Sequence, residues 1–496
     1  MAIGNLESVQ SVKLLSEVLV VECRSLNTCI EACTQTYENR NIRSPIVRSK
    51  VDDMGRNAPE IKVAPPGPKA KPIVDKDHKF IATSTKTAPI AVARGYGVFV
   101  EDVDGNRYLD FTSGVGVLNV GHCHPDVVDA IKIQAELFTH YAGTDYYYGI
   151  QADLAQRLTE LTPGNFEKKV FYTNSGAESV EAAFKLARWS TKKPLFFAFI
   201  GAFHGRTMGA LALNASKPVH RARYQPMISG VTHVPYANCY RCPYKLEYPG
   251  CDIWCAKAID ELYLSSFVPP EEVAAMFTEP IQGEGGYIVP PPEFFKELKK
   301  IADKYKILLV DDEVQAGFGR TGKWFAIEHH GVVPDIVCTA KGMGSGVPIG
   351  SIIFRKELDW GVAGAHSNTY GGNPIACASS SATIDVIKKE RLLDNATKQG
   401  RYLLKRLNEL KEKYEVIGDV RGKGLMCATE IVKDKKSKGL NPQLRDKIED
   451  ECWKNGLIVL GCGKTAIRYI PPLIIRSEQI DSAVEILEKA IKKSIK

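Results

Sequence analysis

Long apolar runs are missing from this 496-residue sequence, since no stretch reaches the roughly 18–20 apolar residues that a helix needs to span a bilayer. The start of the chain lacks the basic region of a signal peptide, and its apolar run VLVV is too short for one. Five glutamates among the first forty residues argue against a transit peptide. We therefore expect a cytoplasmic protein that does not bind membranes.

A strong excess of one charge sign is also missing. The 65 basic and 58 acidic residues are interspersed and leave a net charge of +7, with no basic stripe interleaved with aromatic residues. This argues against nucleic-acid binding. The content of 44% apolar and 25% charged residues is typical of an ordinary globular protein, and the length allows one large α/β unit with additions or two to three domains.

A complete phosphate-binding P-loop is missing as well. The segment GCGKT at 461–465 ends like one, but the position that requires the first glycine is Ile458. LLVDDE resembles a Walker B strand, yet it precedes this segment and so reverses the common order. These departures argue against a nucleotide hydrolase. The chain also has no apparent internal repeat.

Cysteine is not scarce, but only one group of the thirteen is clustered. The segment CYRCPYKLEYPGCDIWC has the spacing C-x2-C-x8-C-x3-C and contains Cys239, Cys242, Cys251 and Cys255. Two close pairs suit tetrahedral thiolate ligation of a structural zinc ion, or a pair of disulfides. A surface loop of reduced cysteines is the third interpretation, and the spacing leaves all three open.

The first part of the chain differs in composition from the rest. Residues 1–55 contain an amphipathic stretch and precede a proline-rich linker, NAPEIKVAPPGPKAKP, for which we expect an extended conformation. We treat 1–55 as an appendage, either helical or disordered, and Met54 could be the natural start of the protein.

From about residue 95 the pattern becomes one of strands alternating with helices. YGVFVEDVDGNRYLDF predicts a β-hairpin with its turn at Asp104–Gly105. Apolar strand candidates then alternate with amphipathic helical segments, which predicts an α/β fold whose mainly parallel sheet has helices on both faces. After about residue 385 we expect a separate α+β lobe. The strand candidates are KKVFYTN, LFFAFIG, AAMFTEP, KILLVDDEV and DIVCTAK.

Glycine-bearing polar segments follow these strands, where ligands of such sheets bind. In TNSGAES, Ser175, Gly176 and Ala177 open a helix directly after a strand, so backbone N–H groups there could hold an anion. A simply capped helix start is the alternative. In LLVDDEVQ, one of Asp311 and Asp312 must face the crevice, because adjacent strand residues point to opposite faces.

Lys341 ends an apolar strand in IVCTAKGMGSGVPIG, just before three closely spaced glycines. A lysine against apolar walls loses solvation of its charged form, so its amine becomes available as a nucleophile. Pyridoxal 5′-phosphate is the cofactor that uses such a lysine together with an anion site and a carboxylate for its ring nitrogen. The alternative for the lysine alone is a solvated surface residue.

Taken in order, these motifs resemble the class III (ω-) aminotransferases, which are pyridoxal-phosphate enzymes of fold type I. The resemblance extends from about residue 60 to the C-terminus, in particular to archaeal 4-aminobutyrate aminotransferases and to relatives that include ornithine and acetylornithine aminotransferases and amino-acid racemases. It implies a large domain with a mainly parallel seven-stranded sheet, at residues 126–385. It also implies a small α+β domain made of residues 56–125 and 386–496.

The resemblance also implies roles for individual residues. Lys341 would bind the cofactor covalently and carry protons, Asp312 would pair with the ring nitrogen, and Gln315 would lie by the ring's phenolic oxygen. Thr369 would reach the phosphate of the partner subunit, which implies at least a homodimer. The other cofactor-binding residues implied are Ser175, Gly176 and Ala177 at the phosphate and Phe203 and His204 in the segment FHGR.

The substrate residues implied by the resemblance favour a short ω-amino acid. Arg206 matches the arginine that binds the distal carboxylate, while Glu284 and Arg468 match a pair that opens to admit the α-carboxylate of 2-oxoglutarate or glutamate. Glu279 belongs to the same EPIQGEGG segment as Glu284, and Val115 stands where ornithine-specific members tend to have tyrosine. We expect 4-aminobutyrate:2-oxoglutarate transfer, with ornithine, lysine or acetylornithine transfer and amino-acid racemisation as alternatives.

Overall fold

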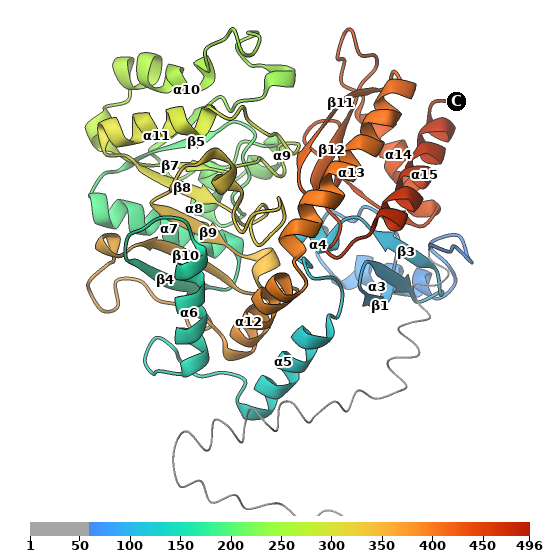
Figure 1. Cartoon of the computed structure of the whole chain (residues 1–496), viewed down its shortest axis with the longest axis horizontal. Helices are drawn as coiled ribbons and strands as arrows, with labels where there is room; N and C mark the ends of the chain where they lie inside the picture. The colour runs from blue at the N-terminus through green and yellow to red at the C-terminus, as the bar shows by residue number, and fades with distance from the viewer. Residues whose placement is uncertain (1–58) are drawn as a thin grey trace, which may run out of the picture. The chain divides into compact units, whose positions relative to one another are not determined.

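The computed structural model describes residues 59–496, which belong to a single compact unit (Figure 1). The predicted appendage, residues 1–55, lies outside these described residues. Within the described part, no helix is both long enough and apolar enough to cross a membrane.

The centre of this unit is a seven-stranded sheet with the order β4-β10-β9-β8-β7-β5-β6. Its strands run parallel except for β10, which is antiparallel to both of its neighbours. The predicted α/β fold with a mainly parallel seven-stranded sheet is therefore confirmed. The strands are β4 (Lys168–Thr173), β5 (Leu195–Phe199), β6 (Val231–Val234), β7 (Val273–Thr278), β8 (Leu308–Asp312), β9 (Ile336–Thr339) and β10 (Gly350–Arg355).

Both faces of the large sheet are buried, as their near-continuous apolar strands require. In β5, Phe196 and Ala198 belong to one hydrophobic core, whereas Phe197 and Phe199 belong to another. This alternation follows from the two-residue period of a strand. The apolar side chains of α7 (Gly176–Thr191) fill the first core, since this helix contacts β4, β10, β9, β8 and β7.

The remaining helices cover the sheets or connect the strands (Figure 1). The α-helices are α3 (Ala70–Phe80), α4 (Ser113–Gly116), α5 (Pro125–Leu137), α6 (Gly149–Leu161), α8 (Met208–Leu213), α9 (Pro218–Arg221), α10 (Trp254–Ala258), α11 (Phe294–Tyr305), α12 (Pro374–Lys389), α13 (Leu392–Lys413), α14 (Pro442–Lys454) and α15 (Ser477–Ser494). The shorter turns of helix are η1 (Cys239–Arg241), η2 (Ile259–Leu264), η3 (Pro270–Glu272), η4 (Ala326–His330), η5 (Lys341–Met343) and η6 (Lys356–Leu358).

Two four-stranded sheets, β1-β2-β3-β13 and β11-β12-β15-β14, lie outside the large one. Because β13 pairs in parallel with β3, the N-terminal hairpin is joined to the C-terminal part of the chain. The division into 56–125, 126–385 and 386–496 stays a prediction. The strands are β1 (Val92–Tyr96), β2 (Phe99–Asp102), β3 (Arg107–Asp110), β11 (Ile417–Lys423), β12 (Met426–Ile431), β13 (Leu457–Ile458), β14 (Leu460–Cys462) and β15 (Ala466–Tyr469).

The predicted hairpin is confirmed, because β2 and β3 pair antiparallel on either side of the turn at Asp104–Gly105. The prediction of an extended linker was wrong at its end. Helix α3 begins at Ala70, inside the proline-rich segment, with Pro72 in its first turn. Proline is tolerated there, because the first N–H groups of a helix have no intrahelical partner.

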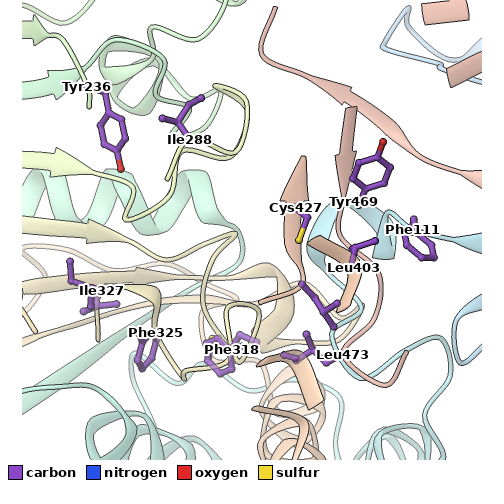
Figure 2. Close-up of a cluster of buried hydrophobic side chains, with 14 of the residues drawn as sticks. Phe111, Tyr236, Ile288, Phe318, Phe325, Ile327, Leu403, Cys427, Tyr469 and Leu473 are labelled. Atoms are coloured by element: carbon purple, nitrogen blue, oxygen red, sulfur yellow. The ribbon is translucent and has the colours of Figure 1, made fainter. Parts of the chain in front are cut away.

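The larger hydrophobic core continues from the large sheet into the C-terminal lobe (Figure 2). Phe318 and Phe325 lie on the side of the large sheet, and Leu403, Leu473 and Tyr469 lie on the side of the lobe. The two regions therefore share one apolar interior.

Candidate active site

A cavity of about 1030 Å³ opens where β4, β5, β7, β8 and β9 end. Carboxyl ends of parallel strands meet at one edge of a sheet, and this is where ligands of such folds bind. The cavity is lined by every non-cysteine site residue predicted from the sequence except Thr369: Val115, Ser175, Gly176, Ala177, Phe203, His204, Arg206, Glu279, Glu284, Asp312, Gln315, Lys341 and Arg468.

Lys341 opens the short helix η5 two residues after the end of β9. Its φ of +45° lies in the left-handed region, which is uncommon for a residue with a side chain and typical of strained functional positions. Burial lowers the pKa of its amine, against the opposing effect of Asp312, and nearby Arg468 lowers it further. The environment thus favours the neutral, nucleophilic amine that the sequence predicted.

Asp312 ends β8 with its carboxylate in the cavity and is 4% exposed. Its Oδ2 lies 2.7 Å from His204 Nδ1, and its Oδ1 accepts a hydrogen bond from the backbone N–H of Val314 at 3.0 Å. Burial opposes the charged form of His204, but the contact with Asp312 outweighs burial and raises the His204 pKa. His204 therefore fixes the orientation of the carboxylate.

The other acid of the pair, Asp311, is fully buried and does not line the cavity. The structure thus selects Asp312 as the residue that faces the crevice.

The start of α7 supplies backbone N–H groups at the cavity wall. Ser175 caps this 16-residue helix, since its Oγ accepts a hydrogen bond from the N–H of Glu178 at 3.2 Å. A Cβ atom at Gly176 would lie 2.7 Å from Val314 Cγ1, so the close packing at this point requires glycine. A helix N-terminus with small residues can hold a phosphate group.

Gln315 has a buried side-chain Oε1 without a hydrogen-bond partner, at the cavity wall. Buried polar atoms in native proteins are nearly always paired, so this oxygen marks a place for a polar ligand. Together with Lys341, Asp312 and the start of α7, it fits pyridoxal phosphate. Phe203 lines the same wall, and its predicted role in cofactor binding stays a prediction.

Arg468, on β15, is paired with Glu284 across the cavity. Arg468 Nη1 lies 3.3 Å from one carboxylate oxygen of Glu284, and Lys217 Nζ lies 2.5 Å from the other. Burial alone would raise the pKa of Glu284, but Arg468 and Lys217 outweigh it and hold this pKa below its ordinary value. Glu284 is thus a charged carboxylate shared by two cations.

Arg206 contrasts with Arg468, since it is exposed at the cavity and has no ion pair within residues 59–496. Its guanidinium lies 5.4 Å from the centre of the Phe203 ring, which is a cation–π contact. Arg206 is therefore available at the cavity, whereas a carboxylate covers Arg468.

Glu279 and Val115 line the cavity in different ways. The carboxylate of Glu279 accepts backbone hydrogen bonds from Phe203 at 3.0 Å and from Gly283 at 2.8 Å, so it holds two loops together, and burial raises its pKa to about 7. Its predicted contact with substrate stays a prediction. Val115 lies at the cavity with a φ of +67° in the kinked segment Ser113–Gly116.

Sequence reasoning missed several residues of the cavity. Lys217 and His220 follow β5 and α8 in a stretch without a motif, and Arg445 and Glu449 come from α14 in the C-terminal lobe. Glu449 accepts a hydrogen bond from the N–H of Gly461 at 3.0 Å, and burial raises its pKa to about 7. No local pattern marked these residues, because only the packing of the lobe brings them to the site.

Thr369 is exposed and does not line the cavity of its own chain. This position is compatible with the prediction that it serves the site of a partner subunit, which stays a prediction.

The zinc prediction for the cysteine cluster (Cys239, Cys242, Cys251 and Cys255) is not supported. Among residues 59–496, no group of three or more His, Cys, Asp or Glu side chains could hold a metal ion. The four thiols are also free, so neither of the predicted disulfides is formed in this structure. All four nevertheless line one small cavity of about 20 Å³, away from the candidate active site.

Comparison with known proteins agrees with this site. The model of the family "Aminotransferase class-III" matches residues 80–491. An alanine/serine racemase of Pyrococcus horikoshii is 41% identical over 88% of this chain and 93% of that protein. An acetylornithine aminotransferase of Methanosarcina mazei is 41% identical over 84% of this chain and 96% of that protein. A probable 4-aminobutyrate aminotransferase of Bacillus subtilis is 35% identical, again over 84% and 96%.

Solved structures give the same result. An aminotransferase of Bacillus anthracis superposes with a TM-score of 0.80 and 30% identity, over 86% of this chain and 99% of that one. The ω-transaminase of Pseudomonas jessenii in complex with PMP superposes with a TM-score of 0.80 and 27% identity, over 85% of this chain and 98% of that one.

Proposed function

Because the chain belongs to the class III aminotransferase family, we propose that it transfers the amino group of a short ω-amino acid, 4-aminobutyrate, to 2-oxoglutarate. The products would be succinate semialdehyde and glutamate. One observation carries this proposal: of the three arginines that line the cavity, Arg206 has no ion pair within residues 59–496, whereas Arg468 is covered by Glu284 and Arg445 is paired with Asp446.

The family implies pyridoxal phosphate, which would be held by Lys341, Asp312 and the start of α7. When bound, this cofactor withdraws electrons from the substrate carbon that carries the amine. Asp312, oriented by His204, would pair with the ring nitrogen and favour its protonated form. Lys341 would remove the proton from the substrate carbon, and the lowered pKa of its amine suits this role of general base.

The two arginines would distinguish the two substrates. An ω-amino acid has one carboxylate, far from its amine, and Arg206 would bind it while Glu284 keeps Arg468 covered. 2-Oxoglutarate has a second carboxylate next to its reacting carbon, which would displace Glu284 and form a bidentate contact with Arg468. Glu284 would then retain Lys217 as its partner, so that its charge stays compensated.

The proposal predicts a change in the visible spectrum when 4-aminobutyrate alone is added to the cofactor-loaded enzyme. The absorption band of the aldehyde form of the cofactor should give way to that of the amine form, and 2-oxoglutarate should restore it. Ornithine, acetylornithine and lysine are the comparison donors. No change with 4-aminobutyrate, together with a change with one of these, would contradict the substrate assignment.

Amino-acid racemisation is the second candidate, because relatives at 41% and 39% identity include an alanine/serine racemase and a leucine/methionine racemase. A racemase would return the proton to the opposite face of the same carbon without an oxo acid. Incubation with L-alanine, L-serine or L-leucine alone, followed by chiral chromatography, tests this. Appearance of the D-enantiomer would favour racemisation, and a purely L sample would exclude it for these substrates.

A further inference from the structure

The cysteine cluster lies between β6 and β7 of the large sheet, in a segment that contacts the C-terminal lobe through Arg241. The N-terminal pair, Cys239 and Cys242, lies in and just after η1. In the C-terminal pair, Cys251 lies three residues before α10 and Cys255 lies in its first turn. All four residues line the same cavity of about 20 Å³, a little more than the space of one water molecule. The two pairs, which are far enough apart in sequence to close a loop, thus line one cavity.

The thiols of the two pairs lie close enough to influence one another. The pKa of Cys239 is raised by burial and then by Cys251 and Cys242. The pKa of Cys255 is raised to about 12, first by burial and then by the other three cysteines. For Cys239 the stronger of the two thiol effects on its pKa comes from Cys251, which belongs to the opposite pair and lines the same cavity.

The segment that carries these cysteines is hydrogen-bonded to the loop 279–286. We call this loop the gate loop, because it contains Glu284, which covers Arg468. Just before the cluster, the hydroxyl of buried Tyr236 donates hydrogen bonds to the backbone oxygens of Glu279 at 2.9 Å and Pro280 at 3.3 Å. Tyr236 also belongs to the large core (Figure 2). One end of the gate loop therefore depends on this segment.

Arg241, between Cys239 and Cys242, connects the segment to the C-terminal lobe. Its Nε donates to Glu430 on β12 at 3.0 Å, and its Nη1 donates to the backbone oxygen of Lys438 at 2.7 Å. Glu430 in turn binds Arg421, whose Nε and Nη2 donate to the backbone oxygen of Gly286 at 2.9 and 2.6 Å. The other end of the gate loop thus depends on the same segment, through the lobe.

We propose that the cysteine cluster is an oxidisable staple, in which a disulfide forms between the N-terminal pair and the C-terminal pair. The oxidant is a low-molecular-weight disulfide, RSSR. A thiolate of one pair attacks RSSR and releases one RSH, and a thiol of the other pair then attacks the mixed disulfide, loses its proton and releases a second RSH. Two protein thiols are oxidised and one RSSR is reduced to two RSH.

The staple would lower the conformational freedom of the unfolded chain, because it closes a loop of between 10 residues (Cys242–Cys251) and 17 residues (Cys239–Cys255). In the folded protein it would fix Tyr236 and Arg241 relative to each other, and with them both ends of the gate loop. The raised pKa of Cys239 and that of Cys255 make attack by either of these two thiols slow at neutral pH and faster in mild alkali, since the thiolate is the attacking form.

The test is peptide mapping of the full-length holoenzyme after equilibration with oxidised glutathione and alkylation of the remaining thiols. Trypsin cuts after Arg241 and Lys245, so Cys239 and Cys242 fall on separate peptides, and the C-terminal pair shares a third peptide, 246–257. We expect 246–257 to be joined to one of the other two peptides and to be released by reductant. Four alkylated thiols, a disulfide confined to 246–257 or between Cys239 and Cys242, or one equivalent of zinc per chain would overturn the proposal.

A thermal measurement gives a second readout. The oxidised wild type should unfold about 3 °C above the reduced wild type. The double variant Cys239→Ser/Cys242→Ser should lose this difference, whereas Cys123→Ser, at an exposed cysteine outside the cluster, should retain it. Equal midpoints of oxidised and reduced wild type would overturn the staple even if the double variant failed to fold.

Discussion

Lys217 offers a sharp test of how the proposed site distinguishes its two substrates. Its ammonium lies 2.5 Å from one oxygen of Glu284, whose other oxygen faces Arg468 at 3.3 Å. Admission of 2-oxoglutarate requires Glu284 to leave Arg468 while keeping a cationic partner. The variant Lys217→Met removes that partner and retains most of the length of the side chain.

The expected size of the effect on KM follows from how far Lys217 and Glu284 are buried. The side chain of Lys217 is 34% exposed and that of Glu284 is 18% exposed, so their contact lies between a surface pair and a fully buried one. A contact of this kind contributes about 1–1.4 kcal/mol, which corresponds to a factor of about five to ten in an equilibrium. We expect KM for 2-oxoglutarate to rise by about this factor, because a separated Glu284 would have no compensating charge.

The assay measures the two half-reactions separately. Conversion of the cofactor by 4-aminobutyrate alone should change less than about twofold in Lys217→Met, because Glu284 stays on Arg468 during that step. Lys132→Met, at an exposed lysine of α5 that does not line the cavity, is the matched control. A slower first half-reaction with an unchanged KM for 2-oxoglutarate would refute the reasoning, since it would mean that Lys217 binds the donor.

Three further predictions concern the catalytic lysine, a buried acid pair and the subunit interface. Lys341→Ala should abolish turnover and leave no cofactor attached to the denatured protein, as mass spectrometry would show; residual covalent cofactor would contradict the assignment. Burial raises the pKa of Asp311 well above its ordinary value and that of Glu313 to about 8. Both acids are therefore neutral in the folded protein at pH 5 and must ionise as pH rises, so the free energy of unfolding should fall between pH 5 and pH 8. Asp311→Asn, which mimics the neutral acid, should reduce this fall in melting temperature by a few degrees, and an unchanged pH dependence would count against it. Mixing unfolded Lys341→Ala and Thr369→Ala chains and refolding them together should recover part of the activity if Thr369 serves the partner's site, whereas no recovery would place Thr369 outside that site.

The sequence identified those parts of the site whose signals are local. Ser175 and Lys341 each follow an apolar strand and stand beside glycine, so the position of a strand end was enough to predict that they would meet. The two-residue period of a strand shows that Asp311 and Asp312 point to opposite faces, but it does not show which face borders the cavity. That depends on how the strand is placed in the assembled sheet. In the assembled sheet Asp312 lines the cavity, whereas Asp311 is fully buried away from it.

Residues that long-range packing brings to the site gave no such signal. Lys217 stands in a loop without a motif, and Glu449 is on α14, far along the chain from every strand end of the large sheet. The zinc prediction lacks support for a related reason. Spacing states how near cysteines are in sequence, but coordination depends on whether their sulfur atoms converge, and the structure has no such metal-holding group within residues 59–496.

The reversal of direction at β10 has a consequence for how the enzyme would lose activity on heating. Lys341 lies in a short connection between β9 and β10, and these strands are neighbours in the middle of the sheet, so both ends of the connection are held by ladder hydrogen bonds. Core strands held in this way exchange their amide protons mainly when the structure opens as a whole. We therefore expect the amides of β9 and β10, which flank the lysine, to be among the last to exchange, and inactivation to coincide with global unfolding.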